Sequence, residues 1–147
     1  MPDLEFTAVG ESHSPARVEV AARGFRLVVD EPPALGGEDR GPNPVEYILA
    51  GLIGCLNVMG HLVAREQGIV LRSLRIEARG PINPAKLFGQ PTDDRPGYKR
   101  IDVRLQVGTD ASDEALAHWL RTVESRCPVS DNLGNATPVA LGFARAA

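Results

Sequence analysis

One apolar run constrains the fold of this chain more than any other feature. Residues 47–60 form a stretch of fourteen residues without a charged side chain. Helix-start signals precede this run: Asn43 is a suitable N-cap, Pro44 suits the first helical position, and Glu46 stands where it can close a capping box. Fourteen residues fall short of the roughly 20 that a membrane-spanning helix requires. The run therefore predicts a long helix, buried in the protein, that stops at Gly68.

Three glycines lie inside this predicted helix: Gly51, Gly54 and Gly60. Each costs about 1 kcal/mol relative to alanine in a helix interior. Their presence suggests that another segment of backbone passes very close to the helix. Because the helix is apolar on nearly every side, it must be surrounded, either by its own sheet or by a partner.

The remaining elements follow from hydrophobic periodicity. Alternation of apolar and polar residues predicts strands over residues 4–8, 18–20, 25–29, 69–79 and 98–107, and a last strand over 139–143. A second helix begins at Thr109 or Ser112 and is interrupted at the Cys127-Pro128 step. The expected architecture is α+β: antiparallel sheets packed around the long central helix plus a second helix, in a single domain of residues 1–147.

Composition excludes several classes of function. With 16 basic and 19 acidic side chains, the net charge of −3 provides no basic field for nucleic acid or a membrane surface, and 5% aromatic residues are few for base stacking. The first residues lack the basic and apolar segments of a signal peptide, so we expect a cytoplasmic protein. Two cysteines without clustered histidines form neither a disulfide scaffold nor a zinc site. We therefore expect no metal and no cofactor.

The two cysteines stand in different surroundings. Cys55 lies in the apolar helix, where burial raises the pKa of a thiol unless a cation reaches it from elsewhere in the fold. Cys127 precedes Pro128, and if Pro128 starts a helical turn, Cys127 lies at a helix N-terminus that favours the thiolate. Free cysteines are often small buried hydrophobes, and the residues alone leave that structural role open for both.

Three segments together resemble the OsmC/Ohr family of osmotically inducible and organic hydroperoxide resistance proteins. The segments are residues 41–56 (GPNPVEYILAGLIGCL), the upstream 35–37 (LGG) and the downstream 126–130 (RCPVS). The resemblance covers almost the whole chain, including the order of strands and helices. A helical cysteine after Asn-Pro, paired with a later Cys-Pro, is its most specific part.

The resemblance implies an intertwined homodimer that reduces organic hydroperoxides with a pair of cysteines at each interface site. Carried over by position, Cys55 matches the peroxidatic cysteine and Cys127 the resolving one. The resemblance also implies an external dithiol reductant, of the lipoyl type in relatives. Such a cycle passes from thiolate to sulfenic acid to disulfide.

Family peroxidases also use an arginine beside the thiolate and a glutamate that holds it. The family glutamate directly follows Asn-Pro, where this chain has Val45, with Glu46 one residue later. Glu46 is therefore a candidate binding residue or, alternatively, only the capping-box residue of the helix. Four arginines are open candidates for the cation: Arg17, Arg23, Arg26 and Arg40. Because this chain departs from the family pattern at Val45, an alternative function stays open: a non-peroxidase OsmC-like protein that binds a small apolar ligand at the dimer interface.

Overall fold

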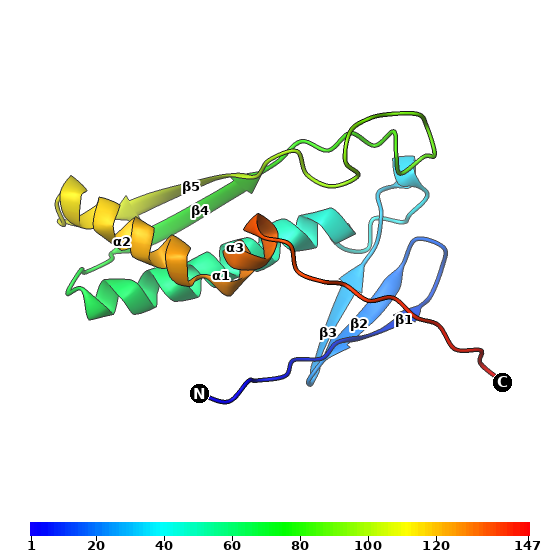
Figure 1. The fold of residues 1–147 in the computed structure, drawn as a ribbon, viewed down its shortest axis with the longest axis horizontal. Helices are drawn as coiled ribbons and strands as arrows, with labels where there is room; N and C mark the ends of the chain where they lie inside the picture. The colour runs from blue at the N-terminus through cyan, green and yellow to red at the C-terminus, as the bar shows by residue number, and fades with distance from the viewer. The chain divides into compact units, whose positions relative to one another are not determined.

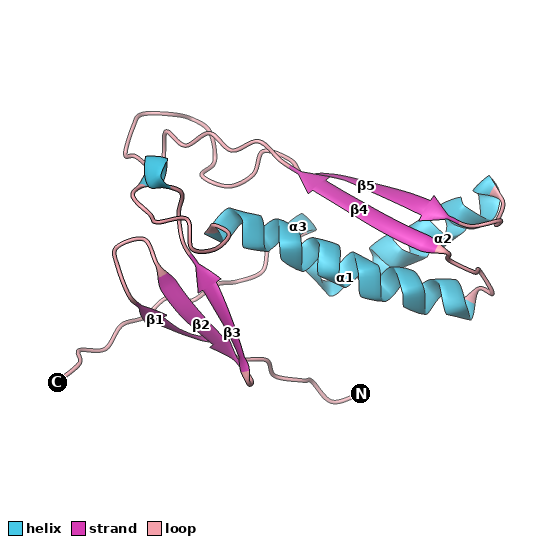
Figure 2. Cartoon of the chain, turned by 180° about the vertical axis from the view of Figure 1, so that it is seen from behind, coloured by secondary structure: helices cyan, strands magenta, loops and turns pink.

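The computed structural model describes residues 1–147 and contains two compact units, Met1–Ala50 and Gly51–Ala147. Figure 1 shows the elements in chain order, and Figure 2 shows them from behind. They are β1 (Val9–Ser12), β2 (Val18–Ala22), β3 (Phe25–Val29), the 3-10 helix η1 (Pro33–Leu35), α1 (Pro44–Glu66), β4 (Ser73–Arg79), β5 (Asp102–Gly108), α2 (Asp113–Arg126) and α3 (Pro128–Gly134). The helix α1 begins in the first unit and continues in the second. Three α-helices and two small antiparallel sheets confirm the predicted α+β class.

The first unit is built on the antiparallel sheet β1-β2-β3. Val18 lies opposite Val29 and Val20 opposite Leu27, so apolar residues pair across β2 and β3. The turn between these strands includes Arg23 with a φ of 54°, in the left-handed region. No side chain of the three strands is fully buried within the chain.

The predicted strand over residues 4–8 is wrong. The strand β1 begins only at Val9, which lies opposite Ala21, and Leu4 and Phe6 are exposed. The strand β2 ends at Ala22, one residue beyond Ala21, and the turn follows at Arg23, so β2 is too short to pair with residues 4–7. The alternation of apolar and polar residues predicted which residues suit a strand, but a strand also needs a second strand to pair with.

Asp30 organises the loop between β3 and α1. This carboxylate is 1% exposed and accepts hydrogen bonds from the backbone N–H groups of Glu31, Glu38 and Arg40. The N–H of Arg40 is the main cause of the lowered pKa of Asp30, with help from the other two N–H groups. A Cβ at Gly37 would overlap the carbonyl of Glu31, so the closed loop requires glycine at that position.

The predicted capping box opens α1 and is confirmed. The Asn43 N–H donates to Oε2 of Glu46 at 2.8 Å, and the Glu46 N–H donates to Oδ1 of Asn43 at 2.9 Å. Nearby, the Tyr47 hydroxyl donates to the carbonyl of Val28 at 2.7 Å, which ties the first turn of α1 to β3. Both contacts fix where the helix starts.

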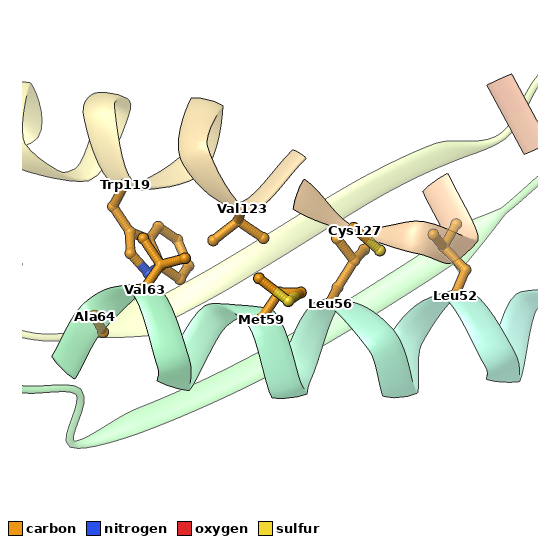
Figure 3. Close-up of a cluster of buried hydrophobic side chains, with 8 residues drawn as sticks. All are labelled: Leu52, Leu56, Met59, Val63, Ala64, Trp119, Val123 and Cys127. Carbon is orange, nitrogen blue, oxygen red and sulfur yellow. The ribbon is translucent and has the colours of Figure 1, made fainter. Parts of the chain in front are cut away.

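The second unit places the hairpin β4-β5 beside α1 and α2 (Figures 1 and 2). Inward residues pair across the hairpin, with Leu74 opposite Val107 and Ile76 opposite Leu105, and they pack against a buried cluster. Figure 3 shows this cluster between the helices; its members are Leu52, Leu56, Met59, Val63, Ala64, Trp119, Val123 and Cys127. The core of this unit thus lies where α1 and α2 meet.

The three helix glycines differ in their surroundings. A Cβ at Gly60 would lie 3.2 Å from Cζ2 of Trp119 and from Cδ2 of Leu74, so side chains pack closely there. A Cβ at Gly51 or Gly54 would meet nothing within 4 Å. The expectation of a close backbone is therefore wrong within this chain: a ring and a leucine approach Gly60, and the other two glycines face open space.

The C-terminal segment and α1 also depart from their predictions. Residues 139–143 form no strand, and Leu141 and Phe143 are each 95% exposed. The helix α1 is longer than the uncharged run, and by length and composition it is apolar enough to cross a membrane. Core helices of soluble proteins pass the same test, and 33% of its most apolar stretch is buried in this chain.

Candidate active site

The structure brings the two cysteines together. Cys55 lies on α1 and is half-buried, whereas Cys127 lies between α2 and α3 and is 1% exposed. Their Sγ atoms lie 2.9 Å apart, although the residues are 72 positions apart in the chain. Both are free thiols. Figure 3 shows Cys127 turned towards α1 beside Leu56.

Local sequence explains the position of Cys127. A residue before proline is forced out of the helical region, and Cys127 is extended, with φ −80° and ψ 111°. The helix α2 therefore ends at Arg126, and Pro128 begins α3 in the first helical position, where its missing N–H is not needed. Cys127 becomes the N-cap of α3, and its Sγ accepts a hydrogen bond from the Ser130 N–H at 3.4 Å.

Three side-chain contacts hold α2 against α1 and so position Cys127, which directly follows α2. The buried indole N–H of Trp119 donates to the carbonyl of Gly60 at 2.9 Å. Gln67 donates to the Thr122 hydroxyl at 3.3 Å. The Arg126 guanidinium forms a two-point ion pair with the Glu66 carboxylate, at 2.6 and 3.2 Å, directly beside Cys127 in the chain.

The two thiols are electrostatically unequal. Burial raises the pKa of the Cys55 thiol, and the hydrogen bond with Cys127 raises it further. Burial also acts to raise the pKa of the Cys127 thiol, but its contacts with the Cys55 side chain and with the backbone and hydroxyl of Ser130 outweigh burial and lower that pKa. The pKa values of the two thiols therefore shift in opposite directions.

This geometry can support thiol–disulfide chemistry. A disulfide bond requires a sulfur–sulfur distance of about 2.05 Å, so the two sulfurs at 2.9 Å need only a small displacement to bond. The half-buried Cys55 is the more accessible of the two sulfurs. The buried Cys127 sulfur lies close enough to attack the Cys55 sulfur once Cys55 has been oxidised.

Glu46 is engaged elsewhere. Its carboxylate accepts the N–H of Asn43 in the capping box, as described above. Among the arginines considered for the cation, Arg17 and Arg40 both pair with Glu38 at 3.3 Å. The other two have different partners: Arg26 pairs with Glu19, and Arg23 lies over the ring of Phe25.

Sequence reasoning missed one residue that contacts a sulfur, Ser130, and one that holds the end of α2, Glu66. Ser130 contributes its N–H and hydroxyl to Cys127, and Glu66 holds Arg126. A signal for Ser130 was present, since a serine two positions after a proline at N1 stands where its N–H faces the N-cap. Glu66 carried no local signal, because its partner is 60 residues away in the chain.

Comparisons with known proteins agree with this fold. A profile of the OsmC-like protein family matches residues 36–142. A hydroperoxide reductase from Mycoplasma genitalium is 20% identical over 131 residues, covering 89% of this chain and 88% of that protein.

Two solved structures are similar. An OsmC-like protein from Mycoplasma pneumoniae has a TM-score of 0.78 at 19% identity, covering 90% of this chain and 89% of that one. An organic hydroperoxide resistance protein from Legionella pneumophila has a TM-score of 0.62 at 20% identity, covering 90% and 91%. These likenesses establish the shared fold, and with the profile match over most of its length the chain belongs to the OsmC-like protein family.

Proposed function

We propose that this protein is a thiol-dependent peroxidase that reduces organic hydroperoxides through Cys55 and Cys127. The observation that carries the proposal is the 2.9 Å distance between the two Sγ atoms. Relatives named for hydroperoxide reduction and organic hydroperoxide resistance support the same substrate class. The apolar side chains of α1 suit the alkyl part of such a substrate.

The reaction balances with this pair as the electron source. The Cys55 sulfur attacks the distal oxygen of the hydroperoxide, the O–O bond breaks, and an alcohol leaves as Cys55 becomes a sulfenic acid. The Cys127 sulfur then attacks Cys55, forming the S–S bond and releasing the oxygen as water. The hydroperoxide gains two electrons, which the two thiols lose, and an external dithiol restores them.

Replacement of Cys55 tests this proposal. The variant Cys55→Ser should lose turnover of tert-butyl hydroperoxide with a dithiol, because serine cannot form the sulfenic acid. A coupled assay of hydroperoxide consumption measures it. The exposed Ser125 on α2 provides a control, since Ser125→Ala should retain wild-type turnover. Wild-type turnover in Cys55→Ser would exclude the proposed reaction.

The proposal also covers the location, assembly and reductant of the protein. The protein acts as a cytoplasmic homodimer, outside the membrane and without nucleic acid, with a dithiol of the lipoyl type as reductant. Exposed apolar side chains support a second copy; they are Leu4, Phe6, Val58, Val139, Leu141 and Phe143. The open space at Gly51 and Gly54 gives a second copy room to approach α1.

One observation favours a second candidate function. The carboxylate nearest the family's glutamate position, Glu46, is used in the capping box. A non-peroxidase member that binds a small apolar ligand at the dimer interface would not need that carboxylate. Such a protein would consume no tert-butyl hydroperoxide and form no Cys55–Cys127 disulfide. A peroxidase would consume the hydroperoxide and form the disulfide.

A further inference from the structure

The two cysteines of the candidate site differ in how far their own chain covers them. Cys127 is 1% exposed and belongs to the buried cluster, together with Leu56 and Val123 (Figure 3). Cys55 packs against the same cluster but is only half-buried. Because residues of the same chain cover Cys127, association with a second copy would not expose it. Cys55 is therefore the sulfur that an external molecule can reach.

The backbone on both sides of Cys127 is held in place. The helix α2 ends at Arg126, directly before Cys127, and the two-point ion pair with Glu66 ties that end to α1. On the other side, the Cys127 carbonyl accepts the Asp131 N–H at 3.0 Å in the first turn of α3. Turning the Cys127 sulfur out to solvent would therefore require the end of α2 or the start of α3 to lose these contacts.

A disulfide bond between the two sulfurs keeps this difference. The Sγ atoms lie 2.9 Å apart, so bond formation needs only a small displacement and leaves Cys127 within the cluster. In thiol–disulfide exchange, the incoming thiolate approaches one sulfur along the line of the S–S bond, from the side opposite the other sulfur. Burial closes that approach to Cys127, whereas Cys55 has exposed surface from which the approach can start.

We propose that the external dithiol attacks the disulfide at Cys55, so that Cys55 carries the mixed disulfide and Cys127 is the first thiol released. This inference rests on the proposed function, which supplies both the disulfide and the reductant. Cys55 then reacts with both external molecules, first the hydroperoxide and later the dithiol. Cys127 reacts only with Cys55.

The reduction balances in atoms and electrons. One thiolate of the dithiol attacks Sγ of Cys55, a bond forms between these two sulfurs, and the Cys55–Cys127 bond breaks. Cys127 leaves as a thiolate and takes up a proton. The second sulfur of the dithiol then attacks the first, which closes the oxidised ring of the reductant and releases Cys55. The dithiol loses two electrons, the protein disulfide gains them, and the two protons of the dithiol are replaced on the two cysteines.

A map of the mixed disulfide tests this order of reduction. The Cys55–Cys127 disulfide is formed in full-length protein with diamide, which accepts the two electrons of the thiols, so the test does not depend on peroxidase activity. The monothiol 2-mercaptoethanesulfonate is then added, because it has no second sulfur that could release Cys55. Early samples are quenched with acid, alkylated with N-ethylmaleimide and mapped by peptide mass. The monothiol is expected on Cys55 and the maleimide on Cys127, and equal or reversed labelling would overturn the inference.

Hydroperoxide consumption by the same preparation separates this inference from the proposed function. The monothiol on Cys127, in a protein that consumes tert-butyl hydroperoxide, would reject the order of reduction alone. The monothiol on Cys55, in a protein that consumes no hydroperoxide, would reject the peroxidase and leave Cys55 as the sulfur that external thiols attack. Failure of diamide to join the two cysteines would reject both.

Single-cysteine variants measure the access to each sulfur separately. The thiol that remains in Cys127→Ser or in Cys55→Ser reacts with 5,5′-dithiobis(2-nitrobenzoate), once in the native protein and once in urea that unfolds it. Plateau rates at high pH are compared, so that access is separated from ionisation. Folding should slow the reaction of Cys127 at least about tenfold more than that of Cys55, because burial restricts thiol exchange. Equal slowing of both thiols, or stronger slowing of Cys55, would contradict the proposed order of reduction.

Discussion

Asp30 illustrates how a single carboxylate can close a loop. Its three backbone hydrogen bonds are satisfied only while the side chain is ionised, which is why its pKa is lowered. A lowered pKa in the folded state means that the carboxylate stabilises the fold above the pKa of the unfolded chain. That contribution is lost as the pH falls through the lower folded pKa.

We predict that Asp30→Asn lowers the free energy of unfolding at neutral pH, because an amide cannot accept all three hydrogen bonds. The difference in free energy of unfolding between wild type and variant should narrow as the pH falls. A protonated Asp30 carboxyl, like the amide of asparagine, has one oxygen fewer that accepts hydrogen bonds well. Urea unfolding at several pH values measures the gap. Asp39→Asn is the matched control: it lies exposed in the same loop, at φ 58°, a conformation that asparagine tolerates. A gap that stays constant with pH would contradict the prediction.

Among the elements, the helix ends were predictable and the outer strands were not. Asn43, Pro44 and Ser112 each act within one turn of backbone, so local sequence was sufficient to predict the starts of α1 and α2. Strands over 4–8 and 139–143 depend on a neighbouring strand that periodicity cannot reveal. The candidate site shows the same division: Cys55 and Cys127 stood out through their local motifs, whereas the Arg126–Glu66 contact depends on the packing of α2 on α1.

Close packing of α1 against α2 leads to a prediction for Gly60. Trp119 is buried and hydrogen-bonded to the Gly60 carbonyl, so its ring cannot easily move away from a new methyl group. Gly60→Ala should therefore destabilise the protein by about 1 kcal/mol, because strain exceeds the gain in helix propensity. Thermal and urea unfolding measure this change. Gly24→Ala, where a Cβ meets nothing within 4 Å, should be nearly neutral, and a stabilised Gly60→Ala would contradict the packing described here.

For the whole molecule, the exposed apolar segments matter most. The sheet of the first unit has no fully buried side chain, and Leu141 and Phe143 are almost fully exposed. Apolar surface of this extent on one chain is typical of a protein that associates. The proposed homodimer would cover such surface and would offer the outer strand segments a neighbour.

We predict that the protein sediments as a dimer and that the double variant Leu141→Asp, Phe143→Asp shifts it towards monomer. Two buried charges at an interface disfavour association, because they lose hydration without gaining a partner. Analytical ultracentrifugation over a range of concentrations measures the shift. Leu87→Asp places the same charge on an exposed loop leucine as a control. A monomeric wild type, or a dimer unaffected by the double variant, would contradict the proposed assembly.

The central claim is that Cys55 and Cys127 form a redox pair for organic hydroperoxides. Its most direct test is a peptide mass map, under non-reducing conditions, of reduced full-length protein treated with one equivalent of tert-butyl hydroperoxide. The result predicted is consumption of the hydroperoxide with the peptides of Cys55 and Cys127 joined by a disulfide bond. Recovery of both cysteines as free thiols, with the hydroperoxide unconsumed, would contradict the claim.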